Sequence, residues 1–171
     1  MRVTRYPYGV PGWGVGEIWM RDGIVIQHEL ASEELDLVTQ GFPAGTVPAG
    51  TSRKCAGIVS DLCRRIAGHL EGDPTSYDGI VIDLDWATPL QHELAAAART
   101  IPWGEVVSYG ELAALAGRPG AARAAGSFCA DNRYSLIIPC HRVIAANGIG
   151  GYGAAGPGLK RRLLALEGVH L

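Results

Sequence analysis

The first half of the chain alternates short apolar runs with turn signals, a pattern typical of a small antiparallel sheet. Apolar segments flank Asp22-Gly23, a dipeptide that favours a tight hairpin because the turn needs positive φ angles. Residues 41–50 are rich in proline and glycine and are predicted to form a loop. A helical pattern follows from about residue 52 to 70, and residues 79–84 are predicted to form another strand of the sheet.

From Thr88 onward the pattern changes to short helices. Thr88-Pro89 supplies an N-cap residue and a proline at the first helical position. Ser108, followed by Glu111, forms a capping-box pattern that opens a second helix. Glycine and proline at 117–120 break the chain before an alanine-rich third helix over 121–129. The overall pattern predicts an α+β protein whose second half is mostly helical.

The second and third of these helices are joined by a tight turn, as in a helix-turn-helix. The third helix has a surface of small residues, from which Arg123 projects as one long side chain. Small residues let a helix approach another surface closely, either a DNA minor groove or a neighbouring helix of the same protein. The pattern alone is compatible with both.

Residues 146–158 are too rich in glycine for regular structure and are predicted to form either the wall of a site or an ordinary linker. A final helix with an apolar stripe is predicted over 159–167, and Gly168 marks its end. A short strand around Cys140 lies between the third and final helices in this prediction.

Composition and charge narrow the function classes. No apolar run approaches the ~20 residues needed to cross a bilayer, and the N-terminus has no apolar signal core, so we expect a cytoplasmic protein with reduced cysteines. No cysteine or histidine spacing indicates a metal site. Up to residue 87 the chain has 7 Lys and Arg against 12 Asp and Glu, and beyond it 8 against 5. The basic second half is compatible with a phosphate backbone or with ordinary surface charge.

The run Ile137-Ile138-Pro139-Cys140-His141-Arg142-Val143 places a thiol beside an imidazole between apolar residues. Such a pair can generate a thiolate nucleophile, whereas a buried cysteine can equally be inert core packing. Neighbouring side chains of a regular strand point to opposite faces. Either the chain therefore turns at Cys140, or a water relays the proton between the two groups.

Several ordered motifs together resemble one family, the methylated-DNA-[protein]-cysteine methyltransferases, or O(6)-alkylguanine-DNA alkyltransferases. The resemblance is specific from about Thr88 to the C-terminus. It rests on Tyr109, Arg123-Ala124-Ala125-Gly126, Asn132, Pro139-Cys140-His141-Arg142-Val143, Gly151-Tyr152 and Leu164-Ala165-Leu166-Glu167-Gly168.

The resemblance implies DNA repair by irreversible, single-turnover transfer of an alkyl group from O(6)-alkylguanine to Cys140, with O(4)-alkylthymine as a second candidate substrate. His141 would deprotonate Cys140 through a water, Glu167 would hold His141, and Asn132 would complete the hydrogen-bond network. No cofactor or metal is implied. The two domains would be a ribonuclease-H-like α/β domain over 1–86 and a DNA-binding, alkyl-transfer domain over 87–171.

The implied partner is double-stranded DNA with alkylated bases, bound through its minor groove by a monomer that does not associate with membranes. Arg123 would fill the gap left by the flipped base. The other implied DNA contacts are Tyr109, Gly110, Arg118, Ala122 and Gly126. The implied substrate pocket comprises Ser135, Pro139, Tyr152 and Gly153.

This chain departs from the family pattern just before the reactive run. Residues 133–136 lack the two prolines that most members have there, so the pocket wall is expected to differ in shape. Ala130 stands where some relatives have a second basic residue. The alternatives are a lesion sensor without transfer activity, a cysteine hydrolase and a simple transcription factor. The sensor relatives replace the cysteine that is kept here, and a hydrolase would need an oxyanion hole.

Overall fold

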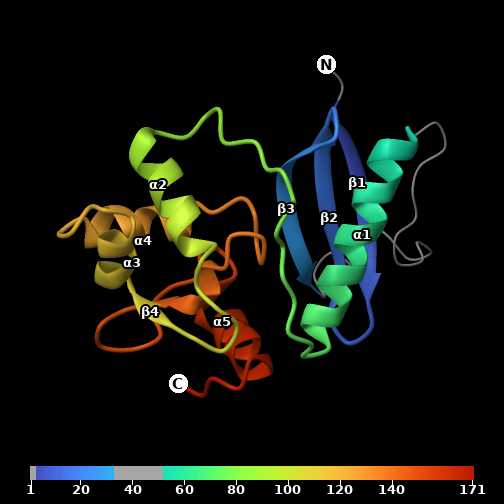
Figure 1. Cartoon of the computed structure of the whole chain (residues 1–171). Helices are drawn as coiled ribbons and strands as arrows, with labels where there is room; N and C mark the ends of the chain where they lie inside the picture. The colour runs from blue at the N-terminus through green and yellow to red at the C-terminus, as the bar shows by residue number, and fades with distance from the viewer. Residues whose placement is uncertain (1–2, 33–51) are drawn as a thin grey trace. The chain divides into compact units, whose positions relative to one another are not determined.

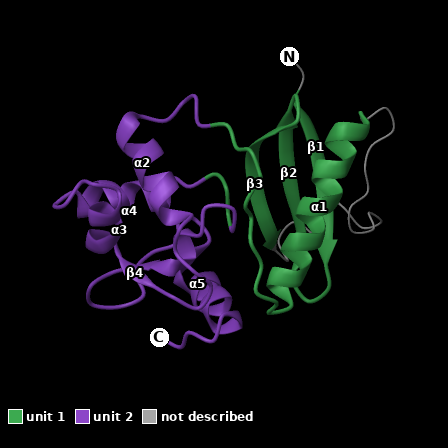
Figure 2. Cartoon of the chain, in the orientation of Figure 1, with its two compact units in different colours: residues 1–83, 133–135 green, residues 84–132, 136–171 purple. Residues whose placement is uncertain are grey.

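The structure is a computed structural model that describes residues 3–32 and 52–171. The predicted loop at 41–50 lies outside the described residues. The chain forms two compact units, coloured separately in Figure 2. Unit 1 comprises residues 1–83 and 133–135, and unit 2 comprises residues 84–132 and 136–171. Residues 133–135 therefore belong to a different unit from the segments on either side of them.

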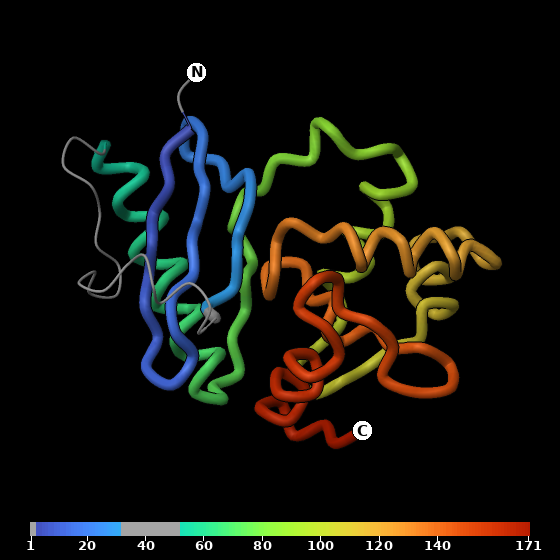
Figure 3. Tube along the Cα trace, turned by 180° about the vertical axis from the view of Figure 1, so that it is seen from behind, coloured from blue at the N-terminus to red at the C-terminus, as the bar shows by residue number. Residues whose placement is uncertain are grey.

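Unit 1 is built on a three-stranded antiparallel sheet in the order β1-β2-β3, with β1 at Thr4–Val10, β2 at Gly14–Arg21 and β3 at Ile24–Ser32. Figure 3 traces the strands as consecutive hairpins. The predicted hairpin is confirmed, since Asp22 and Gly23 both have positive φ angles, 52° and 85°. This pair of left-handed residues matches the twist of the flanking strands.

Helix α1, at Arg53–Leu70, packs beside the sheet (Figure 1). Ser52 caps its N-terminus by accepting a hydrogen bond from the Cys55 backbone, in agreement with the predicted start. Its buried residues recur at helical spacing: Val59, Leu62, Cys63, Ile66, His69 and Leu70. Cys55, in the first turn of the helix, is only half-buried.

Two short segments pair with β3 one after the other. Val25 forms a single parallel bridge with Ile82, and His28 forms one with Tyr134. The predicted strand at 79–84 is thus reduced to one bridge, because residues 133–135 occupy the next position along β3. The Tyr134 hydroxyl donates a hydrogen bond to the carbonyl of Asp83, which joins the two segments.

His28 fixes residues 133–135 from inside unit 1. Its backbone N–H donates to Arg133 O at 2.8 Å, and its Nδ1 donates to Ser135 O at 2.6 Å. Burial lowers the pKa of His28 to about 4, so the neutral ring accepts at Nε2 from the Tyr8 hydroxyl at 2.7 Å. A side chain at Gly16 would collide with that hydroxyl. The segment that precedes the reactive run is therefore held by the sheet.

Unit 2 contains four helices, α2 at Pro89–Ala98, α3 at Tyr109–Leu115, α4 at Ala122–Ala130 and α5 at Gly156–Leu166. Both predicted capping boxes are present, at Thr88 with Gln91 and at Ser108 with Glu111. Helix α5 begins three residues before the predicted Leu159, because Pro157 occupies a first-turn position where no backbone N–H is required.

Helices α3 and α4 pack against each other across the turn that joins them. Strand β4, Val107–Ser108, pairs in parallel with β5, Val143–Ile144, so the start of α3 is tied to the segment after Cys140. Cys140 itself lies in a 3-10 turn over Cys140–Arg142, directly before β5, and not in the strand where it was predicted.

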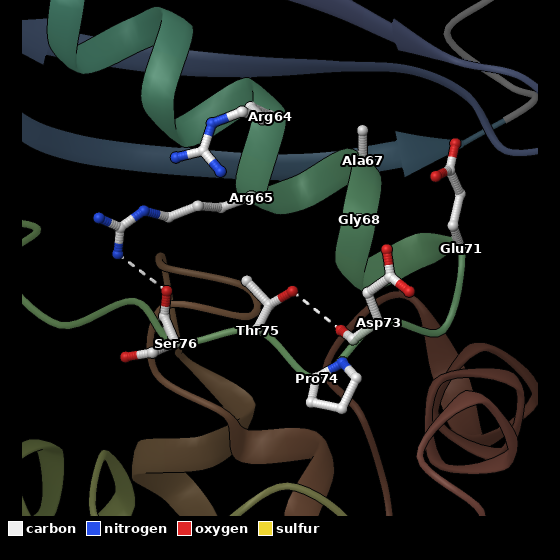
Figure 4. Close-up of a pocket in the computed structure, with 9 residues that line it drawn as sticks. All are labelled: Arg64, Arg65, Ala67, Gly68, Glu71, Asp73, Pro74, Thr75 and Ser76. Carbon is white, nitrogen blue, oxygen red and sulfur yellow. Dashed lines mark hydrogen bonds between the residues drawn. The ribbon is translucent and has the colours of Figure 1, made fainter.

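Figure 4 shows a surface hollow in unit 1 near the C-terminal end of α1. Its basic side chains are already bonded within the unit: Arg65 donates to Ser76 O and Asp78 O at 2.8 and 3.0 Å, and Arg64 pairs with Asp61. No helix within 3–32 and 52–171 is both long and apolar enough to span a membrane.

Candidate active site

The chain turns sharply between Leu136 and Arg142, the segment that contains Cys140. Leu136 has a φ of 67°, a left-handed conformation that is rare for leucine. Cys140 N donates to Ile138 O at 2.8 Å, and Arg142 N donates to Pro139 O at 2.9 Å. The chain therefore turns between the apolar run and β5, as one of the two sequence-based alternatives predicted, and a water relay is compatible with this turn.

Cys140 is almost fully buried, and apolar residues precede it. Leu136, Ile137, Ile138 and Cys140 are each 1% exposed, and Pro139 is also buried. The hydrogen bond with Cys129 and burial raise the pKa of the Cys140 thiol well above its usual range, while the Lys160 ammonium and a hydrogen bond from Asn132 lower it. The resting thiol is therefore protonated at neutral pH and needs a base before it can act as a nucleophile.

Asn132 lies two residues beyond the end of α4. Its amide donates to Ile138 O at 3.0 Å and also contacts the Cys140 thiol. The two amide hydrogens can serve both acceptors. Asn132 thus fixes the turn and stabilises negative charge on the sulfur.

His141 follows Cys140 in the turn and is fully buried. Its Nε2 lies 2.7 Å from Glu167 Oε1. An ionised carboxylate can only accept, so Nε2 must carry the proton, and Nδ1 is then the basic nitrogen of the neutral ring. The Glu167 carboxylate therefore selects the tautomer that can take a proton at Nδ1.

Glu167 receives three donors besides His141, although it is only 6% exposed. Arg142 binds it in bidentate fashion, with Nε 2.9 Å from Oε2 and Nη2 3.0 Å from Oε1. The Gly104 backbone N–H donates to Oε2 at 3.0 Å. Glu167 is the C-cap residue of α5, where a negative charge is unfavourable for the helix dipole. These donors offset that cost.

Arg142 and Lys160 were not assigned roles from the sequence. The Arg142 guanidinium also donates to Ile101 O at 2.7 Å. Lys160 is fully buried, and its Nζ lies 2.5 Å from Val143 O and 3.0 Å from Gly151 O. Burial lowers the pKa of Lys160, whereas the neighbouring thiols Cys129 and Cys140 raise it. The signal in the sequence was a lysine on the apolar stripe of α5, one turn before Leu163 and Leu164.

Tyr109 opens α3 and lies close to the same thiols. Burial raises the pKa of its hydroxyl, as do Cys129 and Cys140, while the Gly151 backbone lowers it. Lys160 Nζ is 5.7 Å from the centroid of the Tyr109 ring. The structure therefore brings Tyr109 near Cys140, along with Asn132.

The predicted pocket residues fall in different places. Tyr152 is half-buried on the glycine-rich segment and forms a bridge with Ala154. Gly153 has a φ of 51°, and a Cβ there would lie 3.0 Å from Ala130 O, so the segment approaches the end of α4 too closely for a side chain. Ser135 belongs to unit 1, where its carbonyl accepts from His28.

The predicted DNA-contacting residues lie on or beside α3 and α4. Arg123 is exposed, whereas Ala125, Phe128 and Cys129 form the buried face of α4. Ala122 and Gly126 are half-buried beside that face, with Gly126 close to the Tyr109 ring. Gly110 is exposed in the first turn of α3. Arg123 is therefore an exposed long side chain among the small residues of α4, and its contact with DNA stays a prediction.

Arg118 follows α3 and is engaged within the protein. Its Nε and Nη2 donate to the Glu93 carboxylate at 2.7 and 2.9 Å. Both side chains are partly exposed, at 54% and 37%. A phosphate contact by Arg118 would require this surface ion pair to open.

We expect Arg142→Met to lower the free energy of unfolding by about 3–5 kcal/mol, because it leaves the Glu167 carboxylate buried with its main counter-charge removed. Urea titration of the full chain measures this. Arg118→Met is the matched control, since it breaks a bidentate pair at the surface, and it should leave the unfolding midpoint nearly unchanged. Equal losses in the two variants would show that the buried pair has no special importance.

Comparison with known proteins identifies the family of this chain. Residues 89–169 match the family described as 6-O-methylguanine DNA methyltransferase, DNA binding domain. The chain is 42% identical over 138 residues to the methylated-DNA–protein-cysteine methyltransferase of Mycolicibacterium paratuberculosis, covering 80% of this chain and 79% of the relative. It is 52% identical over 123 residues to that of Salmonella typhimurium, covering 71% of each chain.

Solved structures give the same result over nearly the whole chain. The crystal structure of Mycobacterium tuberculosis OGT in complex with DNA is similar with a TM-score of 0.73 and 32% identity, covering 95% of this chain and 91% of that one. The O6-methylguanine-DNA methyltransferase of Pyrococcus kodakaraensis, at 23% identity and a TM-score of 0.58, shares the fold. The chain therefore belongs to the methylated-DNA–protein-cysteine methyltransferase family.

Proposed function

We propose that the protein repairs DNA by transferring an alkyl group from O(6)-alkylguanine to its own Cys140. The observation that carries this proposal is the arrangement of a buried thiol, contacted by Asn132, next to a histidine whose tautomer is set by Glu167. This arrangement is typical of a thiol that becomes a nucleophile only when a neighbouring base takes its proton.

The reaction can be written with every atom accounted for. His141 Nδ1 takes the Cys140 proton through a water, and the thiolate attacks the alkyl carbon. The S–C bond forms as the C–O bond breaks, and the electron pair moves to the guanine, which regains the proton in place of the alkyl group. The product is a thioether on Cys140, a stable group that cannot turn over, so each molecule acts once. None of these steps requires a cofactor.

The groups around Cys140 can stabilise the thiolate that this reaction requires. Negative charge develops on a sulfur in an apolar surrounding, which is costly without a compensating group. Asn132 donates to the sulfur, and the buried Lys160 ammonium lowers the pKa of Cys140. Tyr152 and Gly153, on the segment after β5, are proposed to line the substrate pocket together with Pro139, and O(4)-alkylthymine is proposed as its second substrate.

We propose that the exposed face of α4 binds the minor groove of double-stranded DNA. Ala122 and Gly126 leave room for close approach, and Arg123 is the exposed long side chain that would replace the flipped base in the stack. Tyr109 and Gly110, at the start of α3, would contact the backbone of the extruded nucleotide, with Arg118 beside them. The protein is proposed to act as a monomer.

Incubation with an oligonucleotide containing O(6)-methylguanine tests the reaction directly. We expect intact and peptide mass spectra to show a gain of one methylene on the Cys140 peptide, and none in Cys140→Ala. Tight binding of the lesion without a mass change would instead identify a sensor, and catalytic turnover of an ester would identify a hydrolase.

The role of Arg123 is tested by comparing two substrates. Arg123→Ala should slow repair of duplex DNA by about tenfold to a hundredfold, because the unstacked gap, worth a few kcal/mol, is no longer filled. Reaction with the free base O(6)-benzylguanine should stay nearly intact. Arg161→Ala, which removes the same charge from the exposed surface of α5, serves as the control for net charge. Equal losses of Arg123→Ala on both substrates would contradict the proposed role.

A further inference from the structure

Cys129 is a second thiol at the site, and the alkyl-transfer mechanism does not use it. It lies in the last turn of α4, is 8% exposed, and is a free cysteine, as is Cys140. The Cys140 thiol forms a side-chain hydrogen bond with that of Cys129. The two sulfur atoms therefore face each other inside unit 2.

The surroundings of this pair differ from those of an inert buried cysteine. Cys63, in α1, is equally buried at 8%, and burial alone raises its pKa to about 11. Cys129 and Cys140 instead share the buried ammonium of Lys160, which interacts electrostatically with both. They also both interact with Tyr109. The hydrogen bond with Cys129 and burial raise the pKa of Cys140, and the Lys160 ammonium offsets part of that rise by stabilising the thiolate that thiol oxidation requires.

The position of Lys160 is itself tightly fixed. Its Nζ is held between Val143 O, at 2.5 Å, and Gly151 O, at 3.0 Å. Both acceptors are neutral carbonyls. A thiolate formed on either sulfur would place a negative charge near the Lys160 ammonium. Lys160 is thus a fixed cation that would stabilise the thiolate of either cysteine.

We propose that Cys129 and Cys140 form an intramolecular disulfide when a peroxide is present, so that Cys129 acts as a resolving thiol for the alkyl acceptor. The Cys140 thiolate attacks hydrogen peroxide, an S–O bond forms as the O–O bond breaks, and hydroxide leaves. Cys129 then attacks the sulfenic sulfur, the S–S bond forms as the S–O bond breaks, and the oxygen leaves as water. In total, two thiols and one peroxide give one disulfide and two waters.

The bond requires the sulfur atoms to approach to about 2.05 Å, closer than a hydrogen bond. Cys129 is one residue before Ala130, where α4 ends, and Asp131 continues the chain with a hydrogen bond to Ser127 O. Helix ends adjust more readily than helix interiors. We place the movement that the bond requires in the last turn of α4 and in the turn at Cys140.

The disulfide has a clear consequence, which rests on the function proposed for Cys140. While the bond exists, the sulfur cannot accept an alkyl group, and reduction by a thiol restores it. It also prevents further oxidation of Cys140 to sulfinic acid, which small thiols do not reverse. A protein that acts only once per molecule would thereby keep its acceptor through a period of oxidation.

The full-length protein is treated with hydrogen peroxide, its remaining thiols are blocked with N-ethylmaleimide, and peptides are mapped without reduction. We expect a Cys129–Cys140 cross-linked peptide as the main product and two fewer blocked thiols per molecule. Methyl transfer should be lost with the appearance of this peptide and should return after dithiothreitol. Cross-linking of Cys140 to Cys55 or Cys63, or its conversion mainly to sulfinic acid, would overturn the proposal.

Two variants sharpen the result. In Cys129→Ser the cross-link should be absent, and Cys140 should be recovered as sulfinic acid. Dithiothreitol should then restore only a small part of the activity that this variant had before oxidation. Cys63→Ser, the matched buried cysteine, should behave as the wild type. Equal recovery in Cys129→Ser and the wild type would contradict a resolving role. The peptide map does not depend on alkyl transfer. If the cross-link forms but the protein accepts no methyl group, the proposed function is refuted and the proposed disulfide is confirmed.

Discussion

The site of this protein depends on keeping one carboxylate ionised in the interior. Glu167 is buried at the end of α5, yet it receives His141, the bidentate guanidinium of Arg142 and the backbone N–H of Gly104. A buried charge is tolerated only when it is paired and fully hydrogen-bonded. The donors come from the Cys140 turn and from the segment after α2, while Glu167 itself ends the final helix. Stabilising this one carboxylate therefore holds three distant parts of unit 2 together.

The nucleophile and its base have separate sets of partners in this arrangement. Arg142 compensates the charge of Glu167. The carboxylate accepts a hydrogen bond from His141 Nε2, so the basic nitrogen of the imidazole is Nδ1, on the other side of the ring. On the other side, the Cys140 thiol is surrounded by Cys129, Asn132 and Lys160. The protein thus stores a protonated, protected thiol together with the groups that stabilise its anion, which suits an acceptor that is used once.

Local signals were sufficient to predict much of the fold. The caps at Thr88 and Ser108 and the hairpin at Asp22-Gly23 depend only on nearby residues, and each is present. The turn at Cys140 was left as one of two alternatives, because apolar residues on both sides also fit a strand. The pairing of β4 with β5 and the addition of residues 133–135 to β3 are short, non-local contacts that no periodicity reveals.

The sequence predicted the residues of the reactive motif but not the charged side chains that stabilise them. Cys140 and His141 stood out as a pair in the sequence, and Asn132 and Glu167 were identified through a family resemblance. The structure pairs Asn132 with Cys140 and Glu167 with His141. The partners that make the charges tolerable, Arg142 and Lys160, became evident only from burial, since a charged residue in an apolar pattern does not say which acceptor it meets.

The most direct measurement of this account is the tautomer of His141 in the resting protein, read from long-range heteronuclear NMR of its two imidazole nitrogens at neutral pH. A ring protonated at Nε2 and bare at Nδ1 is the predicted result, because Glu167 can only accept at Nε2. A ring protonated at Nδ1 with Nε2 bare would contradict the account, since Glu167 would then not be the group that sets the base.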